Sequence, residues 1–126
     1  LPGLEEGELL YNVTDPERLA ETILATGPRV CVVKLGEKGA YFAEKDGEKG
    51  FVPGLKLETV VDPVGAGDGF AAGTLAGYLD GKPWREAVMV GNKVGGLVTQ
   101  FSGDMEGLPT RAELDALDAD VADVTR

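Results

Sequence analysis

The sequence predicts an α/β fold, and three observations support this prediction. Residues 29–35 (RVCVVKL) form a nearly continuous, β-branched apolar run, which is typical of a strand covered on both faces. Helix signals precede and follow this run. Asp46-Gly47 separates two short apolar segments, as at the turn of a β-hairpin. Strands and helices in this order predict a layered α/β unit.

The elements before residue 63 are predicted from local signals. A helix opens at Pro16, where Thr14 or Asp15 supplies a capping oxygen before a proline suited to the first helical turn, and it ends at Gly27-Pro28. The two strands of the hairpin cover residues 40–44 and 50–53. Residues 59–62 are expected to form a further short strand that leads into a glycine-rich turn.

Three helices are predicted after this turn. The first runs from about residue 68 to residue 79, and the second begins at Pro83. Thr110 and Glu113 form a capping box for the last one. Glycines recur every four residues on the first of these helices, which predicts a close contact with a neighbouring helix or sheet on that side: Gly69, Gly73 and Gly77.

Composition excludes several kinds of chemistry. The 126 residues contain no histidine, which rules out Ser-His-Asp, Cys-His and HExxH sites. The single cysteine, Cys31, lies in the apolar run and is expected to be a buried, reduced, structural thiol. A hydrophobic share of 43% is enough for a folded core, so we expect one domain or part of one.

Charge argues against nucleic acid and anionic membranes as partners. The net charge is −10, of which residues 1–21 and 103–126 each carry −5, whereas residues 22–102 hold nine charges of each sign. The neutral middle is therefore where a site is expected. No apolar stretch is long enough to span a membrane, and no signal-peptide pattern is present, so a cytoplasmic location is expected.

The densest useful glycine cluster is GAGDG at residues 65–69, between the predicted short strand and a helix. The first N–H groups of a helix have no internal partner and point outward at its positive end. Glycine and alanine keep side chains away from these donors, so that an anion can approach closely. The turn therefore predicts an anion-binding site.

Asp68 is unexpected in a site that only binds anions, because a carboxylate repels phosphate. It fits a site where a phosphoryl group meets a hydroxyl that must lose its proton, with Asp68 as the general base. The alternative is that Asp68 is only the N-cap of the helix.

Two other phosphate-binding motifs are excluded. A Walker P-loop needs a glycine five residues before Gly81-Lys82, where Ala76 stands, and Pro83 replaces the required Ser or Thr. A dinucleotide fingerprint that starts at Gly65 would need glycine at position 70, which is Phe70.

The run DPVGAGDGF at residues 62–70 resembles the C-terminal signature of the ribokinase-like (PfkB) carbohydrate kinases. Three further features agree with this family in order and spacing. Residues 34–40 (KLGEKGA) resemble its nucleotide loop at a strand end, Asn92 falls where the family contacts adenine, and residues 4–10 (LEEGELL) resemble a family segment containing an E-L-L pattern. The resemblance covers essentially the whole chain.

The resemblance implies a ribokinase-like three-layer αβα sandwich with a mostly parallel central sheet. It also implies phosphoryl transfer from ATP, with Mg²⁺ neutralising the phosphates. Asp68 would deprotonate a sugar hydroxyl, and the anion hole would consist of the backbone N–H groups of Gly65, Ala66, Gly67 and Asp68. The nucleotide would be held by Lys34, Leu35, Gly36, Glu37, Lys38, Gly39, Ala40 and Asn92. The alternatives are a simple turn after the strand for Gly36 and Gly39, and an exposed polar residue for Asn92.

Two finer features are also implied by the resemblance. Some family members bind a monovalent cation such as K⁺, and the matching positions are Asp62 with the backbones of Val64, Val98 and Gly103; Asp62 is alternatively structural. The Pro63-Val64 variant and residues 103–109 look most like 2-keto-3-deoxygluconate kinases, in which the aspartate matching Asp104 contacts the substrate. A turn-forming aspartate is the alternative for Asp104.

Family members are about twice this length or more, so residues 1–126 are expected to be the C-terminal, nucleotide-binding portion of such a kinase. The N-terminal part and the lid, through which oligomers form, would be absent. The expected activity is ATP-dependent phosphorylation of 2-keto-3-deoxygluconate to its 6-phosphate by a homo-oligomeric full-length enzyme, with the isolated portion inactive. A fructokinase- or ribokinase-type sugar kinase and a non-catalytic nucleotide-binding module are the alternatives.

Overall fold

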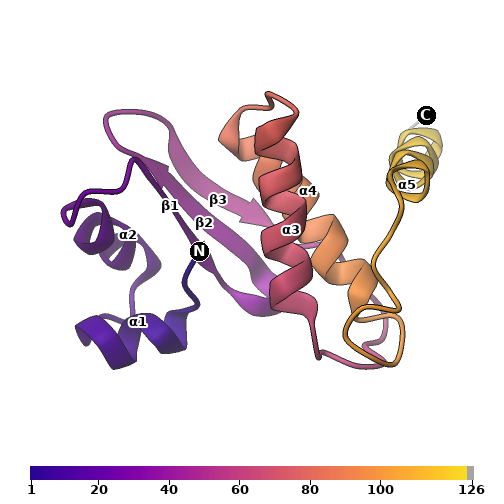
Figure 1. The fold of residues 1–126 in the computed structure, drawn as a ribbon, viewed down its shortest axis with the longest axis horizontal. Helices are drawn as coiled ribbons and strands as arrows, with labels where there is room; N and C mark the ends of the chain where they lie inside the picture. Colours follow the sequence, from indigo (N-terminus) through magenta and orange to yellow (C-terminus); the bar gives the residue numbers. More distant parts are fainter. Residues whose placement is uncertain (125–126) are drawn as a thin grey trace.

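The computed structural model describes residues 1–124, and the side chains of residues 1–117. The elements form three layers, with a sheet between two pairs of helices (Figure 1). The elements are α1 (Leu4–Tyr11), α2 (Pro16–Leu24), β1 (Val30–Lys34), the 3₁₀ turn η1 (Gly36–Lys38), β2 (Gly39–Glu44), β3 (Lys49–Pro53), α3 (Ala66–Leu79), α4 (Trp84–Val98) and α5 (Arg111–Val124). The α/β class and the αβα layering are confirmed.

The sheet of this chain is antiparallel, with the strand order β1-β2-β3. Within residues 1–124, the expected mostly parallel pairing is seen only at an isolated bridge between Gly3 and Lys34. The reason is local: the connections between β1, β2 and β3 are tight turns, and a parallel pair needs a crossover of a dozen or more residues. The predicted hairpin is confirmed, with Asp46 in the left-handed region at φ 58°.

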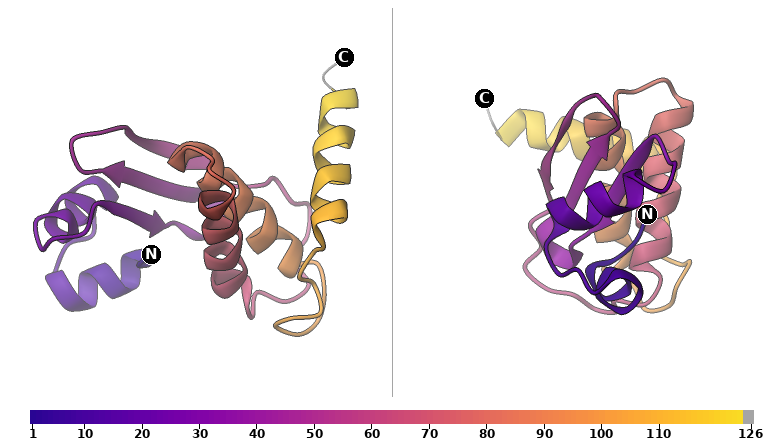
Figure 2. Two further views of the ribbon diagram at one scale, coloured as in Figure 1. Left: turned by 45° about the horizontal axis from the view of Figure 1, so that its top comes forward. Right: turned by 90° about the vertical axis from the view of Figure 1, so that its left-hand side faces the viewer.

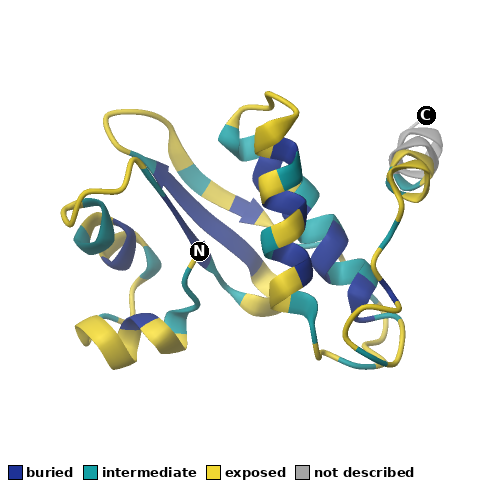
Figure 3. Ribbon diagram, viewed as in Figure 1, coloured by how far each residue is buried: buried dark blue, intermediate teal, exposed yellow. Residues whose placement is uncertain are grey.

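Both faces of β1 are covered, as the apolar run predicted. Helices α1 and α2 lie on one side of the sheet and α3 and α4 on the other, in both views of Figure 2. Figure 3 shows the buried residues gathered along the strands and the inner sides of the helices. One core cluster contains Leu19, Ala20, Cys31, Val33, Tyr41 and Ala43, and the other contains Val32, Ala40, Phe42, Val52, Phe70 and Val88.

The predicted glycine contact lies between α3 and α4. A Cβ on Gly73 would lie 2.8 Å from Val94 Cγ2 and 2.9 Å from the Val90 carbonyl oxygen, and one on Gly77 would lie 2.8 Å from the Ala87 Cα. No side chain fits between the two backbones at these points, so the glycines set the distance between the helices.

Two predicted boundaries change. Residues 59–62 form no strand; the N–H groups of Val61 and Asp62 instead donate to the Thr99 carbonyl oxygen, at 2.8 and 3.1 Å. Helix α3 begins at Ala66, two residues earlier than expected. The capping box before α5 is confirmed, since Thr110 and Glu113 exchange hydrogen bonds of 3.2 and 3.3 Å.

No helix within residues 1–124 is long and apolar enough to cross a membrane.

Candidate active site

The turn before α3 depends on the glycine at position 65. Gly65 has φ 85°, in the left-handed region that favours glycine, and it occupies the N-cap position of α3. A Cβ there would lie 2.5 Å from the Asp104 carbonyl oxygen, so the loop that contains Asp104 packs directly on the turn. The turn and this loop, 39 residues apart in the sequence, therefore form one surface.

The start of α3 leaves hydrogen-bond donors free. The N–H groups of Gly65, Gly67 and Asp68 have no acceptor among the backbone of residues 1–124 and the side chains of residues 1–117. The Ala66 N–H, one of the four predicted donors, instead donates to the Pro63 carbonyl oxygen at 3.2 Å. Three of the four groups thus remain available to an anion at the positive end of the helix.

Asp68 is the third residue of α3, and its side chain is exposed. Because Gly65 holds the capping position and no side chain caps this end, the alternative of Asp68 as an N-cap is wrong. The carboxylate is therefore free of any local structural hydrogen bond and accessible beside the N–H donors.

Lys34 supplies positive charge at the same place. It ends β1, and its Nζ lies 3.6 Å from the position that a Cβ on Gly67 would take. The strand thus delivers an ammonium group to the first turn of α3, next to the free donors. An ammonium group and free N–H donors together suit a phosphate.

Asp62 joins the turn to the following loop. Its Oδ1 accepts from the Val64 N–H and its Oδ2 from the Gly103 N–H, each at 3.0 Å. These hydrogen bonds, first the one from Gly103, lower the pKa of the Asp62 carboxyl below its ordinary value. Asp62, Val64 and Gly103 therefore lie together, as predicted. The alternative, a purely structural role for Asp62, explains the same arrangement.

Val98, the fourth residue of the predicted cation set, is buried in α4. Its carbonyl oxygen accepts from the Phe101 N–H at 3.4 Å and lies 2.9 Å from the position of a Cβ on Gly107. Asp104 is exposed, and its backbone covers Gly65, so it lies beside the start of α3.

The predicted nucleotide loop packs on the end of β3. Residues 36–38 form η1, and the Gly54 N–H donates to the Lys38 carbonyl oxygen at 3.2 Å. Gly39 has φ 104°, and a Cβ there would collide with the Val52 carbonyl oxygen. A side chain is thus excluded at Gly39. This glycine is needed for close packing against β3, and not only for a turn after the strand.

Asn92 reaches the same strand end from α4. Its Nδ2 donates to the Val52 and Pro53 carbonyl oxygens at 3.2 and 3.1 Å, and the residue is half-buried. The alternative of an exposed polar residue is therefore wrong. Asn92 and residues 36–39 both meet β3 where it ends, so the structure brings the two predicted nucleotide segments together.

Sequence reasoning missed two parts of this arrangement. The contact of Gly54 with the loop was not expected, although Pro53-Gly54 after a strand is a turn signal. The anchoring of the Asn92 amide to β3 depends on how α4 crosses the sheet, and nothing in the local sequence indicates it. Within the described side chains, no group of three or more His, Cys, Asp or Glu residues could hold a metal ion.

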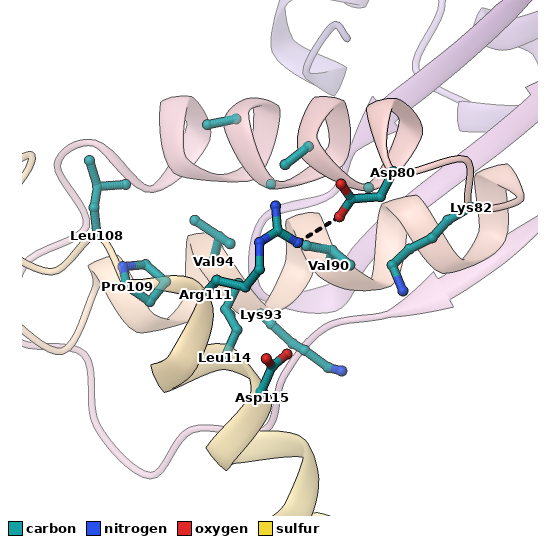
Figure 4. Close-up of a pocket in the computed structure, with 14 residues that line it drawn as sticks. Asp80, Lys82, Val90, Lys93, Val94, Leu108, Pro109, Arg111, Leu114 and Asp115 are labelled. Carbon is teal, nitrogen blue, oxygen red and sulfur yellow. Dashed lines mark hydrogen bonds and ion pairs between the residues drawn. The ribbon is translucent and has the colours of Figure 1, made fainter.

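A cavity of about 410 Å³ lies elsewhere, between α3, α4 and the start of α5 (Figure 4). Arg111 of α5 extends across it to the Asp80 carboxylate at the end of α3, 2.6 Å away. Asp68 does not line this cavity. The candidate site is instead a surface arrangement around the start of α3.

The three layers define the class of the protein as αβα, with a surface of free N–H donors and the Lys34 ammonium at the start of α3. Residues 1–111 match the model of the pfkB family carbohydrate kinases, and the chain belongs to that family. It is 49% identical over 113 residues to a 2-dehydro-3-deoxygluconokinase of Bacillus subtilis (strain 168). This match covers 90% of this chain and 35% of the relative.

Solved structures agree with the family and the fold. The ribokinase of Thermotoga maritima has a TM-score of 0.80 and 28% identity over 92% of this chain and 39% of that protein. A double mutant of the fructokinase of Vibrio cholerae O395, in fructose, ADP and potassium ion bound form, has a TM-score of 0.79 and 31% identity over 90% of this chain and 38% of that protein. The chain thus spans between a third and two fifths of these relatives.

Proposed function

We propose that this chain is the nucleotide-binding, base-carrying portion of an ATP-dependent sugar kinase. The observation that supports this most directly is the surface at the start of α3, where free N–H groups lie near the Lys34 ammonium and the first helical turn carries the exposed Asp68 carboxylate. An anion-binding module needs the first two but gains nothing from the third, since a carboxylate repels phosphate. A kinase needs all three.

In the proposed reaction, Asp68 accepts the proton of a sugar hydroxyl as its oxygen attacks the γ-phosphorus of ATP. The bond from the γ-phosphorus to the bridging oxygen breaks, and ADP leaves. The N–H groups of Gly65, Gly67 and Asp68, together with Lys34, stabilise the charge on the transferring group. When bound, Mg²⁺ would neutralise the phosphates; without a carboxylate cluster here, its ligands would be mainly nucleotide oxygens and water.

The nucleotide base would lie at the other end of the surface, where residues 36–40 and Asn92 meet β3. The Asn92 Nδ2 is engaged with Val52 and Pro53, so its Oδ1 is the atom that remains to accept a hydrogen bond from an adenine amino group. The related Vibrio cholerae fructokinase is described with ADP bound, which supports a nucleotide at this portion of the fold.

A monovalent cation is a further part of the proposal. The hydrogen bonds from Val64 and Gly103 leave each Asp62 oxygen with a lone pair, and the carbonyl groups of Val64, Val98 and Gly103 would add neutral oxygens. The potassium ion described for the related fructokinase supports K⁺ as the ion.

The proposed substrate is 2-keto-3-deoxygluconate, phosphorylated at its 6-hydroxyl. Identity of 49% to the Bacillus subtilis 2-dehydro-3-deoxygluconokinase supports this choice. Asp104 would contact the substrate, since the loop that carries it is fixed against Gly65 beside the phosphate end. Ribokinase- and fructokinase-type substrates are the alternative, supported by the two solved structures.

We further propose that residues 1–126 form the C-terminal portion of the kinase domain, and that the complete enzyme is a homo-oligomer. Because this chain spans 35% of its Bacillus subtilis relative, the function is best tested in a chimera. The chimera joins the part of that relative that precedes the matched region to residues 1–126.

The test is a coupled ADP-release assay of the chimera with 2-keto-3-deoxygluconate, fructose, ribose and nucleosides. We expect turnover with 2-keto-3-deoxygluconate to exceed that with each other compound. A preference for fructose or ribose would overturn the proposed substrate but would still support a sugar kinase. Nucleotide binding without turnover on any compound would favour the non-catalytic module.

A further inference from the structure

The cavity between α3, α4 and the start of α5 lies apart from the candidate active site (Figure 4). The candidate active site is at the first turn of α3, whereas the cavity lies beside the second half of that helix and its end at Asp80. A volume of about 410 Å³ is within the range of sites for small molecules. None of the residues that line the cavity takes part in the reaction proposed above.

The floor of the cavity is apolar. Ala72 and Ala76 lie four residues apart on one side of α3, and their side chains end at the methyl group, which leaves space beside the helix. Val90 and Val94 of α4 are likewise one turn apart, and Leu114 of α5 adds a further apolar wall. A molecule that fills this space therefore needs an apolar body.

The rim of the cavity is charged. It consists of Asp80 and Lys82, which follow α3, Lys93 of α4, and Arg111 and Asp115 of α5. Three of these five side chains are positive, in a chain whose net charge is −10. The rim therefore favours a negative group at one end of the ligand.

Two cations of the rim can donate hydrogen bonds to such a group. Arg111 uses Nη1 for the Asp80 carboxylate, at 2.6 Å, and a guanidinium has further N–H donors. The backbone at Lys82 is fixed, since its N–H donates to the Gly77 carbonyl oxygen at 3.1 Å. The Lys82 ammonium has no acceptor among the backbone of residues 1–124 and the side chains of residues 1–117.

We propose that this cavity binds a small monocarboxylic acid with an apolar body. The carboxylate accepts hydrogen bonds from Lys82 and Arg111, as carboxylates commonly do from ammonium and guanidinium groups, and the body lies on the apolar floor. A phosphate ester fits less well, because it carries nearly two negative charges at neutral pH. The carboxylates of Asp80 and Asp115 in the same rim would repel it more strongly than a single charge.

The sugar acid of the proposed function does not suit this cavity. 2-Keto-3-deoxygluconate is also a monocarboxylate, but its hydroxyl groups would lie against alanine, valine and leucine side chains that offer no hydrogen bond. It therefore serves as a comparison that keeps the carboxylate and changes the body.

Titration calorimetry of residues 1–126 and of the chimera defined above tests the proposal, with 4-methylpentanoate as the probe and without ATP. We expect a Kd of about 1 mM or lower in both proteins. Binding of 4-methylpentanamide, inorganic phosphate or 2-keto-3-deoxygluconate at this cavity should be at least about tenfold weaker.

Three results of this titration would overturn the proposal. They are the absence of saturable binding of the probe, equal or tighter binding of the amide, the phosphate or the sugar acid in competition with the probe, and binding to residues 1–126 that is lost in the chimera. Since no ATP is present, the outcome is separate from that of the ADP-release assay.

A matched pair of variants locates the carboxylate. Lys82→Gln removes the ammonium group and should weaken binding of the probe by about tenfold or more. Lys45→Gln makes the same change at an exposed position in the hairpin turn, outside the cavity, and should leave the affinity unchanged. Equal affinities of the two variants would overturn the role of Lys82 and with it the assigned site.

A second pair locates the apolar body. Ala76→Leu would fill the floor and should abolish binding, whereas Ala112→Leu, at an exposed position of α5 outside the cavity, should not affect it. The urea midpoints of both variants show whether they fold, and the Lys82 pair decides if Ala76→Leu does not. Unchanged affinity of a folded Ala76→Leu variant would place the ligand elsewhere and overturn the proposal.

Discussion

At the scale of single residues, Gly65 fixes the turn on which the candidate site depends. Gly65→Ala would place a methyl group 2.5 Å from the Asp104 carbonyl oxygen, in addition to the strain of φ 85°. Gly81→Ala is the matched control, with φ 81° and no atom within 4 Å of the added carbon. We expect Gly81→Ala to lower the free energy of unfolding, measured in urea, by about 1 kcal/mol. Gly65→Ala should lower it clearly more. Equal costs would mean that the loop at Asp104 does not press on the turn.

Cys31 gives a prediction that depends on pH. Burial raises the pKa of its thiol, so the native state keeps the proton at pH values where the unfolded thiol has lost it. Stability from this group is therefore complete below about pH 8.5 and decreases as the pH rises above it. We expect iodoacetamide to label Cys31 slowly at pH 8.5 in native protein and rapidly in urea. Equal labelling rates would show that the thiol is accessible.

Single residues of the candidate site were predicted to different degrees. The positions of Gly65 and Asp68 follow from a short local motif, because a helix start is determined by its own residues. The loss of the Ala66 donor to Pro63 could not be predicted, since it depends on the detailed shape of the turn. The approach of Lys34 to Gly67 depends on how β1 and α3 pack, which local sequence does not specify.

At the scale of elements, the contact between α3 and α4 relies on glycine. Gly73→Ala raises helix propensity by about 1 kcal/mol, but the added carbon would lie 2.8–3.0 Å from Val94, Val90 and Gly91. We expect net destabilisation by about 1–3 kcal/mol in urea unfolding, as for other overpacked cores. Ala72→Gly, at the exposed neighbouring position, should cost only the propensity of about 1 kcal/mol. A Gly73→Ala variant more stable than the parent would contradict close packing here.

Elements with complete local signals were predicted well, and those that need a distant partner were not. The hairpin follows from Asp46-Gly47, and α2 from its Asp15 cap, whose side chain accepts from the Arg18 N–H. The strand expected at residues 59–62 is absent; the N–H groups of Val61 and Asp62 instead donate to the carbonyl oxygen of Thr99, the residue that follows α4. The prediction of mostly parallel pairing was also wrong, because the length of the connections and the tertiary packing decide which strands pair.

At the scale of the whole molecule, the candidate site lies open on the surface. Asp68 and Asp104 are exposed, and neither lines a cavity described above. An open site leaves a sugar unheld and lets water reach the phosphate, which removes positioning and charge stabilisation together. We therefore expect the isolated chain to show no ADP release above background with ATP and 2-keto-3-deoxygluconate, under conditions where the chimera turns over. Robust turnover by the isolated chain would show that these residues suffice for catalysis.

The central claim is that Asp68, beside the free donors of α3, takes the proton of the sugar hydroxyl. The most direct measurement compares the chimera and its Asp68→Asn variant for turnover and for ATP affinity. Asparagine keeps the shape of the side chain but cannot act as the base, so we expect turnover to fall by about 10²–10⁴-fold, with ATP affinity unchanged or slightly higher. Turnover close to that of the parent chimera would contradict the account.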